Sequence, residues 1–229
     1  MNTRSVCAIW LEEINRGNAP AIFGEVFQLL DRDGTGSSEY GISNEEIAGE
    51  VYGDKTLAVK IPSNLSVLAT MNTSDQNVFT LDTAFQRRWE MKQIANNVMA
   101  AVHANELIQG TTITWGAFAA TVNDAVVDAN SDMVSFEDKR MGAYFVKKEE
   151  LVVDKFPEKA LKYLWDDAFK MNRDYIFNAE LKTFEQVAAE YAKSSEDKLK
   201  TVLRAEIYQK MLLLMTAKED GTVTEATEV

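Results

Sequence analysis

Residues 6–18 of the chain read VCAIWLEEINRGN. The continuous apolar run at 6–11 is typical of a strand that is buried on both faces of a parallel sheet. The run ends abruptly at Glu12 and Glu13, and Asn18 then provides the cap for a helix. In a parallel sheet, ligands bind beyond the carboxyl ends of the strands. This stretch therefore predicts an α/β fold with a candidate ligand site directly after its first strand.

A second stretch repeats this pattern further along the chain. Residues 65–71 (LSVLATM) predict another buried strand, which ends at the polar residue Asn72. A helix that carries the tandem pair Arg87 and Arg88 follows, and residues 89–94 predict a third, short strand. The two polar strand ends should meet at the same edge of the sheet.

The residue types at this edge suit phosphoryl-transfer chemistry. Paired carboxylates such as Glu12 and Glu13 can hold a hydrated Mg²⁺, and the second of them can polarise an attacking water. The amide of Asn72 can orient that water or hold a γ-phosphate oxygen. Arg87 and Arg88 can stabilise the transition-state charge across a subunit interface. Each feature by itself also has a structural interpretation: a strand exit, a polar turn, and a helix-end pair that complements the helix dipole.

The composition excludes several other classes of protein. The chain has 229 residues, of which 46% are hydrophobic and 26% charged, as in globular proteins. Its net charge of −12, with 8 basic and 13 acidic residues in 1–94, argues against direct binding of a nucleic-acid backbone. One cysteine and one histidine allow neither an internal disulfide nor a Cys/His metal cluster. No apolar run reaches membrane-spanning length, so we expect a cytoplasmic protein without a membrane partner.

The second half of the chain has a different character. Residues 95–215 predict an all-helical region, with helices at 96–108 and 196–215 among others, and residues 216–229 predict a frayed tail. Cys7 is expected to act as a small hydrophobic residue inside the first strand. His103 is expected to be structural or exposed. Lys139 and Arg140, next to each other in the chain, are either a sensor 2 or a solvated charge pair.

Three motifs in order resemble the McrB family of AAA+ proteins, the nucleotide-driven motor subunits of modification-dependent restriction systems. LEEINRGNAPAIFGEVFQLLD resembles the Walker B segment, IPSNLSVLATMNTSDQN the strand with sensor 1, and LDTAFQRRWE the arginine-finger helix. MGAYFV and LKYLWDDAFKMNRDYIFN resemble the helical lid of this family. The resemblance implies the carboxyl-terminal part of an AAA+ parallel-sheet core (1–94), followed by an all-helical lid.

The resemblance implies roles for the residues after the first strand. Glu13 would be the catalytic glutamate of Walker B, which activates water. Glu12 stands where the family usually has aspartate, and would hold Mg²⁺ together with Glu13. Asn15 and Arg16 belong to the INR motif, in which they would contact the nucleotide or a neighbouring subunit.

The other two motifs carry further implied roles. Asn72 matches sensor 1, and Asp75 completes an NTxD pattern that is associated with guanine nucleotides in relatives that prefer GTP. The nucleotide is therefore either ATP or GTP. Arg87 and Arg88 match the position of the arginine finger.

No GxxxxGK[ST] phosphate-binding loop occurs in the sequence. In the AAA+ sheet the strand that carries this loop lies between the sensor 1 strand and the strand after the arginine fingers. The resemblance thus implies a truncated or split motor, inactive alone, which hydrolyses NTP with Mg²⁺ at the interfaces of a ring, expected to be a hexamer. The ring would drive an McrC-like endonuclease subunit, and DNA would be bound only by segments that this sequence lacks. The alternative is a non-enzymatic interaction module that docks into an AAA+ ring and donates its arginines in trans.

Overall fold

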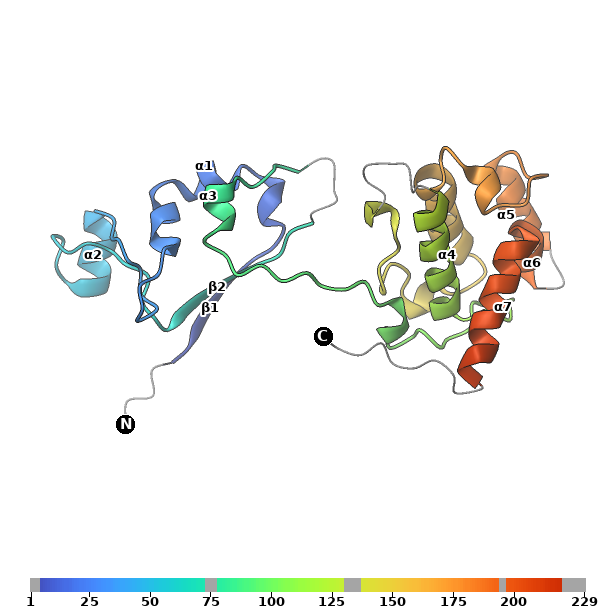
Figure 1. Cartoon of the computed structure of the whole chain (residues 1–229), viewed down its shortest axis with the longest axis horizontal. Coiled ribbons are helices and arrows are strands. Elements are labelled where there is room, and N and C mark those ends of the chain that lie inside the picture. Colours follow the sequence, from blue (N-terminus) through green and yellow to red (C-terminus); the bar gives the residue numbers. More distant parts are fainter. Residues whose placement is uncertain (1–4, 73–77, 130–136, 194–196, 220–229) are drawn as a thin grey trace. The chain divides into compact units, whose positions relative to one another are not determined.

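The computed structural model describes residues 5–72, 78–129, 137–193 and 197–219. The chain divides into two compact units, Met1–Gln93 and Ile94–Val229, called unit 1 and unit 2 below (Figure 1). Within the described residues, no helix combines the length and the apolar character that crossing a membrane requires.

Unit 1 is an α/β unit built on two parallel strands. Strand β1 (Cys7–Leu11) pairs with β2 (Leu65–Ala69), in a register that sets Cys7 beside Leu65 and Leu11 beside Ala69. Figure 1 shows the two strands side by side. The remaining elements are helical: α1 (Ala19–Phe23), α2 (Glu45–Tyr52), α3 (Thr83–Gln86), and the 3-10 helices Ile14–Arg16 and Gly24–Leu30. The α/β class expected from the sequence is confirmed.

Side-chain caps fix where the helices of unit 1 begin. The carboxamide oxygen of Asn18 accepts a hydrogen bond from the backbone N–H of Ala21 (3.3 Å), as the sequence predicts. A carboxylate oxygen of Asp82 accepts from the N–H of Phe85 at 2.7 Å and starts α3. These caps matter for the site because α1 follows Glu13 and α3 leads into the arginine pair.

The prediction that both strands are buried on both faces is wrong. Trp10 is 59% exposed and its neighbour across the sheet, Leu68, is 46% exposed. Cys7, expected to be buried, is exposed as well. Along β2 the burial alternates, because Leu65 and Val67 are half-buried while Leu68 faces solvent. The apolar composition of these strands fits a larger sheet with two covered faces, and the described part of unit 1 covers the Trp10 face poorly.

The prediction of a third strand at 89–94 is also wrong. These residues have no regular structure, and Met91 and Ile94 among them are exposed. A strand exists only by hydrogen bonding to a neighbour, and no described segment pairs with this one. An apolar run is therefore not sufficient by itself to predict a strand at this position.

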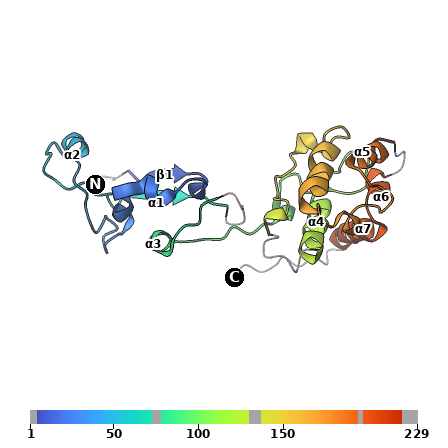
Figure 2. The ribbon, with the colours of Figure 1, turned by 90° about the horizontal axis from the view of Figure 1, so that it is seen from above.

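Unit 2 is helical. Its helices are α4 (Trp115–Ala129), α5 (Phe184–Lys193), α6 (Lys198–Val202) and α7 (Ala205–Glu219), with π-helical turns at Pro157–Leu161 and Leu164–Ala168 and 3-10 helices at Val98–Ala100, Glu137–Lys139, Lys148–Glu150 and Arg173–Tyr175. In both Figure 1 and Figure 2, α5, α6 and α7 lie on the same side of α4.

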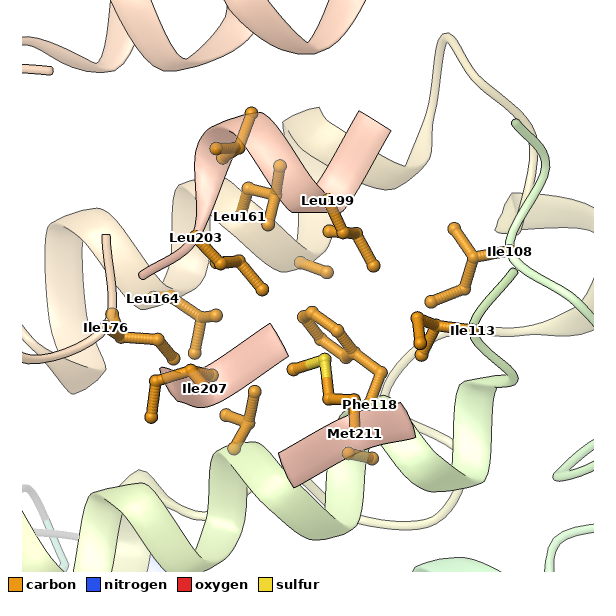
Figure 3. Packing of buried hydrophobic residues seen from close by; sticks show 14 of the residues in the cluster. Ile108, Ile113, Phe118, Leu161, Leu164, Ile176, Leu199, Leu203, Ile207 and Met211 are labelled. Carbon is orange, nitrogen blue, oxygen red and sulfur yellow. The ribbon is translucent and has the colours of Figure 1, made fainter. Parts of the chain in front are cut away.

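One hydrophobic core joins these helices. Phe118 of α4 is fully buried and faces Met211 of α7 and Leu199 of α6 (Figure 3). The ring of Phe118 also meets Phe156 edge to face, with centroids 5.1 Å apart. Unit 2 therefore has a core of its own.

Two helices predicted for unit 2 are not formed as expected. In place of a helix at 96–108 the chain forms only the 3-10 turn Val98–Ala100, because the backbone carbonyls of Ala104 and Glu106 accept hydrogen bonds from the start of α4. The helix expected at 196–215 is divided into α6 and α7. The break falls at Leu203, whose backbone forms a bridge with the distant Phe177.

Two of the other residues singled out in unit 2, His103 and Lys139, have structural partners. His103 is buried, and its Nε2 lies 2.7 Å from the carbonyl oxygen of Val146, with the ring stacked near Trp115. Lys139 forms an ion pair with Asp167. The structural interpretation of His103 therefore fits what is observed.

Replacement of Phe118 by Ala should destabilise unit 2 strongly. Removing a fully buried aromatic ring costs about 3–5 kcal/mol in lost transfer free energy and cavity formation. Urea denaturation followed by circular dichroism measures this loss. Leu213→Ala on the exposed side of α7 is the matched control and should change stability by no more than about 0.5 kcal/mol. Equal midpoints for the two variants would contradict the assigned core.

Candidate functional site

The carboxyl ends of β1 and β2 are joined by hydrogen bonds past the last residue of each strand. The N–H of Thr70 donates to the carbonyl of Leu11 at 2.9 Å, and the N–H of Ile14 donates to the carbonyl of Thr70 at the same distance. These bonds continue the ladder beyond the strands. The residues after β1 and those after β2 are therefore held at one edge, as the sequence pattern predicts.

Glu13 occupies an unusual backbone conformation at this edge. Its φ of 49° and ψ of 51° lie in the left-handed region, and no other described non-glycine residue has a positive φ. A side chain in this region costs about 1–3 kcal/mol and persists where the surroundings impose it, often at functional sites. Here the hydroxyl of Thr70 accepts the N–H of Glu13 at 3.2 Å and the 3-10 helix Ile14–Arg16 begins at the next residue.

The side chain of Glu13 is held by Arg16. The Nε of Arg16 donates to Oε2 of Glu13 at 2.7 Å, and both side chains are more than half exposed. An exposed ion pair of this kind contributes little stability, about 0–1 kcal/mol. It does orient the carboxylate and leave it within reach of solvent. Glu12 is likewise exposed.

Asn15 lies beneath this edge and connects its two sides. It is 4% exposed, and its Nδ2 donates to the backbone carbonyl of Asn72 at 2.7 Å. The backbone carbonyl of Asn15 accepts a hydrogen bond from the N–H of Phe79 at 2.8 Å. Asn15 thus forms one hydrogen bond to Asn72, just after β2, and a second to Phe79, seven residues further along the chain. Asp75 lies within that segment and outside the described residues.

Two residues that contact predicted site residues, Thr70 and Asp31, escaped prediction from the sequence. Thr70 was assigned only to the strand, although its hydroxyl supports the backbone of Glu13. Asp31 was not singled out, although its carboxylate binds Arg88. A hydroxyl residue at the end of an apolar strand was a usable signal for Thr70. No local signal existed for Asp31, since its partner is 57 residues away.

The tandem arginines at the end of α3 have different surroundings. The side chain of Arg88 is 8% exposed, and its Nε and Nη2 both donate to Oδ2 of Asp31, at 3.0 and 2.6 Å. Its Nη1 donates to the carbonyl of Ala84 at 2.5 Å, and its guanidinium lies 4.0 Å from the centroid of the Phe27 ring. Arg87 is exposed, and its backbone N–H continues α3 by donating to Thr83.

The carboxylates at the strand edge fit a magnesium ion that keeps most of its water. Mg²⁺ is commonly bound by one or two carboxylates together with substrate phosphates and waters. Glu12 and Glu13 supply two carboxylates on exposed, adjacent positions. Among the described residues no group of three or more His, Cys, Asp or Glu side chains is placed to hold a metal by itself.

Comparison with known proteins connects the chain to restriction systems. The BsuMI component YdiS, a type II restriction enzyme component of Bacillus subtilis (strain 168), is 36% identical over 192 residues, which cover 79% of this chain and 54% of that protein. The EcoKMcrB subunit, a type IV methyl-directed restriction enzyme subunit of Escherichia coli (strain K12), is 30% identical over 89 residues, 37% of this chain and 17% of that protein. No family model matches the sequence.

The chain is therefore related to components of restriction systems. It spans about half the length of YdiS and a smaller share of the McrB subunit.

Proposed function

We propose that the chain is the Walker B, sensor 1 and arginine-finger part of an McrB-like AAA+ motor, together with its helical lid. The observation that carries this proposal is the joined edge of β1 and β2, where Glu13 and the segment of Asn72 are tied together by backbone and side-chain hydrogen bonds. The similarity to two restriction-system proteins, one of them named as an McrB subunit, supports it.

In this proposal Glu13 is the general base that accepts a proton from the attacking water. Its carboxylate is exposed and oriented by Arg16, so a water molecule can reach it. Asn72, exposed at the same edge, would orient that water or hold a γ-phosphate oxygen. Glu12 and Glu13 would hold Mg²⁺, which when bound neutralises charge on the phosphates. Arg16 would move from Glu13 to a phosphate or a neighbouring subunit when nucleotide binds.

The roles proposed for Asn15, Asp75 and Arg87 are as follows. Asn15 is buried and bonded to the backbone of Asn72, so its contribution to nucleotide binding would be indirect, through the position of the sensor segment. Asp75 is proposed to take part in binding the nucleotide, which is GTP or ATP. Arg87 would stabilise transition-state charge at the site of an adjacent subunit.

We propose that the phosphate-binding loop is supplied from outside this sequence, either by a longer form of the same chain or by a second component. The sequence has no GxxxxGK[ST] motif, and the Trp10 face of the sheet is exposed where a complete core would be covered. In either case the added part would complete this sheet, and the complete motor would assemble into a ring, proposed as a hexamer. An McrC-like endonuclease subunit would be the downstream partner, and DNA would bind through other segments.

A second candidate function is a non-enzymatic module that docks into an AAA+ ring and donates arginine in trans. The outward position of Arg87 and the glutamate at position 12 favour it. It requires the arginine but not the carboxylate of Glu13. The two candidates therefore differ in which residue the hydrolysis rate depends on.

The test of the main proposal is NTP hydrolysis in mixtures. The chain is assayed with GTP and with ATP, alone and with a subunit that carries a phosphate-binding loop from the same restriction system, with Mg²⁺ or EDTA. We expect turnover only in the mixture with Mg²⁺. Equal turnover by the chain alone would contradict its proposed incompleteness, and a mixture no faster than the loop-bearing subunit alone would contradict its proposed role.

A further inference from the structure

Arg87 and Arg88 differ in solvent exposure because they lie on different faces of the turn at the end of α3. Successive residues of a helix are about 100° apart around its axis, so Arg88 lies about 60° from Phe85, while Arg87 lies about 160° from it, almost on the opposite face of the turn. Phe85 is fully buried, and its ring meets Phe23 at 5.4 Å, Phe27 at 5.5 Å and Trp89 at 5.8 Å between centroids. Arg88 therefore shares the inner side of the turn, and Arg87 is presented outward.

Arg88 is bound on several sides of its guanidinium. Asp31 accepts from two of its nitrogens, Ala84 accepts from the third, and the Phe27 ring lies against its plane. With 8% of its side chain exposed, the group has almost no access to solvent. A guanidinium held in this way is unavailable to a phosphate of another subunit without loss of these contacts.

The contacts of Arg88 connect two segments that are far apart in the sequence. Asp31 follows the 3-10 helix Gly24–Leu30 directly, and Phe27 lies within that helix. Arg88 ends the turn that begins at Asp82. The ion pair thus fixes the end of α3 against Gly24–Leu30, immediately beside the exposed Arg87.

We propose that Asp31 and Arg88 are a positioning pair, which holds the end of α3 so that Arg87 alone serves as the arginine finger. This inference rests on the proposed function, which it deepens by dividing the tandem pair into one acting and one supporting residue. Arg88 is a positioning residue because it acts through the backbone of α3 and never touches the nucleotide.

Hydrogen exchange tests the positioning pair without any activity measurement. In the full chain, Asp31→Asn and Arg88→Lys should both raise amide exchange in residues 82–89 by about 10–100-fold, since each weakens a charged hydrogen-bond pair. Exchange in β1 and β2 should stay unchanged. Arg87→Ala is the matched control and should leave residues 82–89 as protected as in the wild type. Unchanged exchange in both Asp31→Asn and Arg88→Lys would overturn the proposal.

A double-mutant cycle tests the link to catalysis in the mixture with the loop-bearing subunit. Arg88→Lys should lower kcat with little change in the nucleotide KM, and it should cause almost no further loss when combined with Arg87→Ala, since it acts through Arg87. If the fold-losses in kcat of the two single variants multiply in the double variant, the proposal is overturned. If the wild-type mixture does not hydrolyse NTP, the proposed function fails, while the exchange experiment still decides whether the pair holds α3.

Discussion

Arg87→Ala should lower NTP hydrolysis by the reconstituted assembly by about 10³–10⁵-fold, the range over which an arginine finger acts. The expectation follows from the exposure of Arg87 at the end of α3, beside an arginine that is fully engaged elsewhere. Nucleotide binding should change little, because the residue acts in the transition state and from a neighbouring subunit. Steady-state hydrolysis and binding of a fluorescent nucleotide separate these two effects.

The control for Arg87→Ala is Lys92→Ala, which removes another exposed positive charge from the same unit. It should keep the wild-type rate. If both variants lose activity equally, the effect reflects net charge or general destabilisation. If Arg87→Ala retains full activity, the residue is not the finger.

Glu13→Gln should lower hydrolysis by about 10²–10⁴-fold, since a glutamine cannot accept the proton of the attacking water. The side-chain oxygen of glutamine can still accept the hydrogen bond from Arg16, so the local structure should persist. Glu12→Asp is the matched control, because it keeps a carboxylate at the neighbouring position and should keep most of the rate. Steady-state kinetics of both variants with the loop-bearing subunit check this expectation.

The outcome for Glu13→Gln also separates the two candidate functions. A loss of hydrolysis supports a catalytic carboxylate in this chain. A rate equal to the wild type, combined with a loss in Arg87→Ala, would contradict the catalytic role of Glu13 and support the non-enzymatic module that donates an arginine.

Local features of the fold followed from the sequence. Asn18 caps α1, and the helix pattern around Phe118 places that residue in the core, because caps and helical periodicity depend on residues only a few positions apart. The parallel pairing of β1 with β2 also followed, since two apolar runs with polar ends suit one sheet edge.

Features that depend on distant partners did not follow. The strand expected at 89–94 needs a neighbour that the described chain does not provide, and the break at Leu203 comes from its bridge to Phe177. From the sequence, Arg87 and Arg88 were both predicted to match the arginine-finger position. Only the position of Asp31 beside Arg88 distinguishes them, and no periodicity connects residues 57 positions apart.

Each chain is proposed to supply the general base Glu13 to one hydrolytic site and the arginine finger Arg87 to the adjacent one. The most direct test mixes Glu13→Gln chains with Arg87→Ala chains in equal amounts, in the presence of the loop-bearing subunit. About a quarter of the interfaces should then combine an intact Glu13 with an intact Arg87 from the adjacent subunit, because each interface draws on two chains. We predict recovery of hydrolysis to roughly that fraction of the wild-type rate. A mixture no more active than either variant alone would contradict the account.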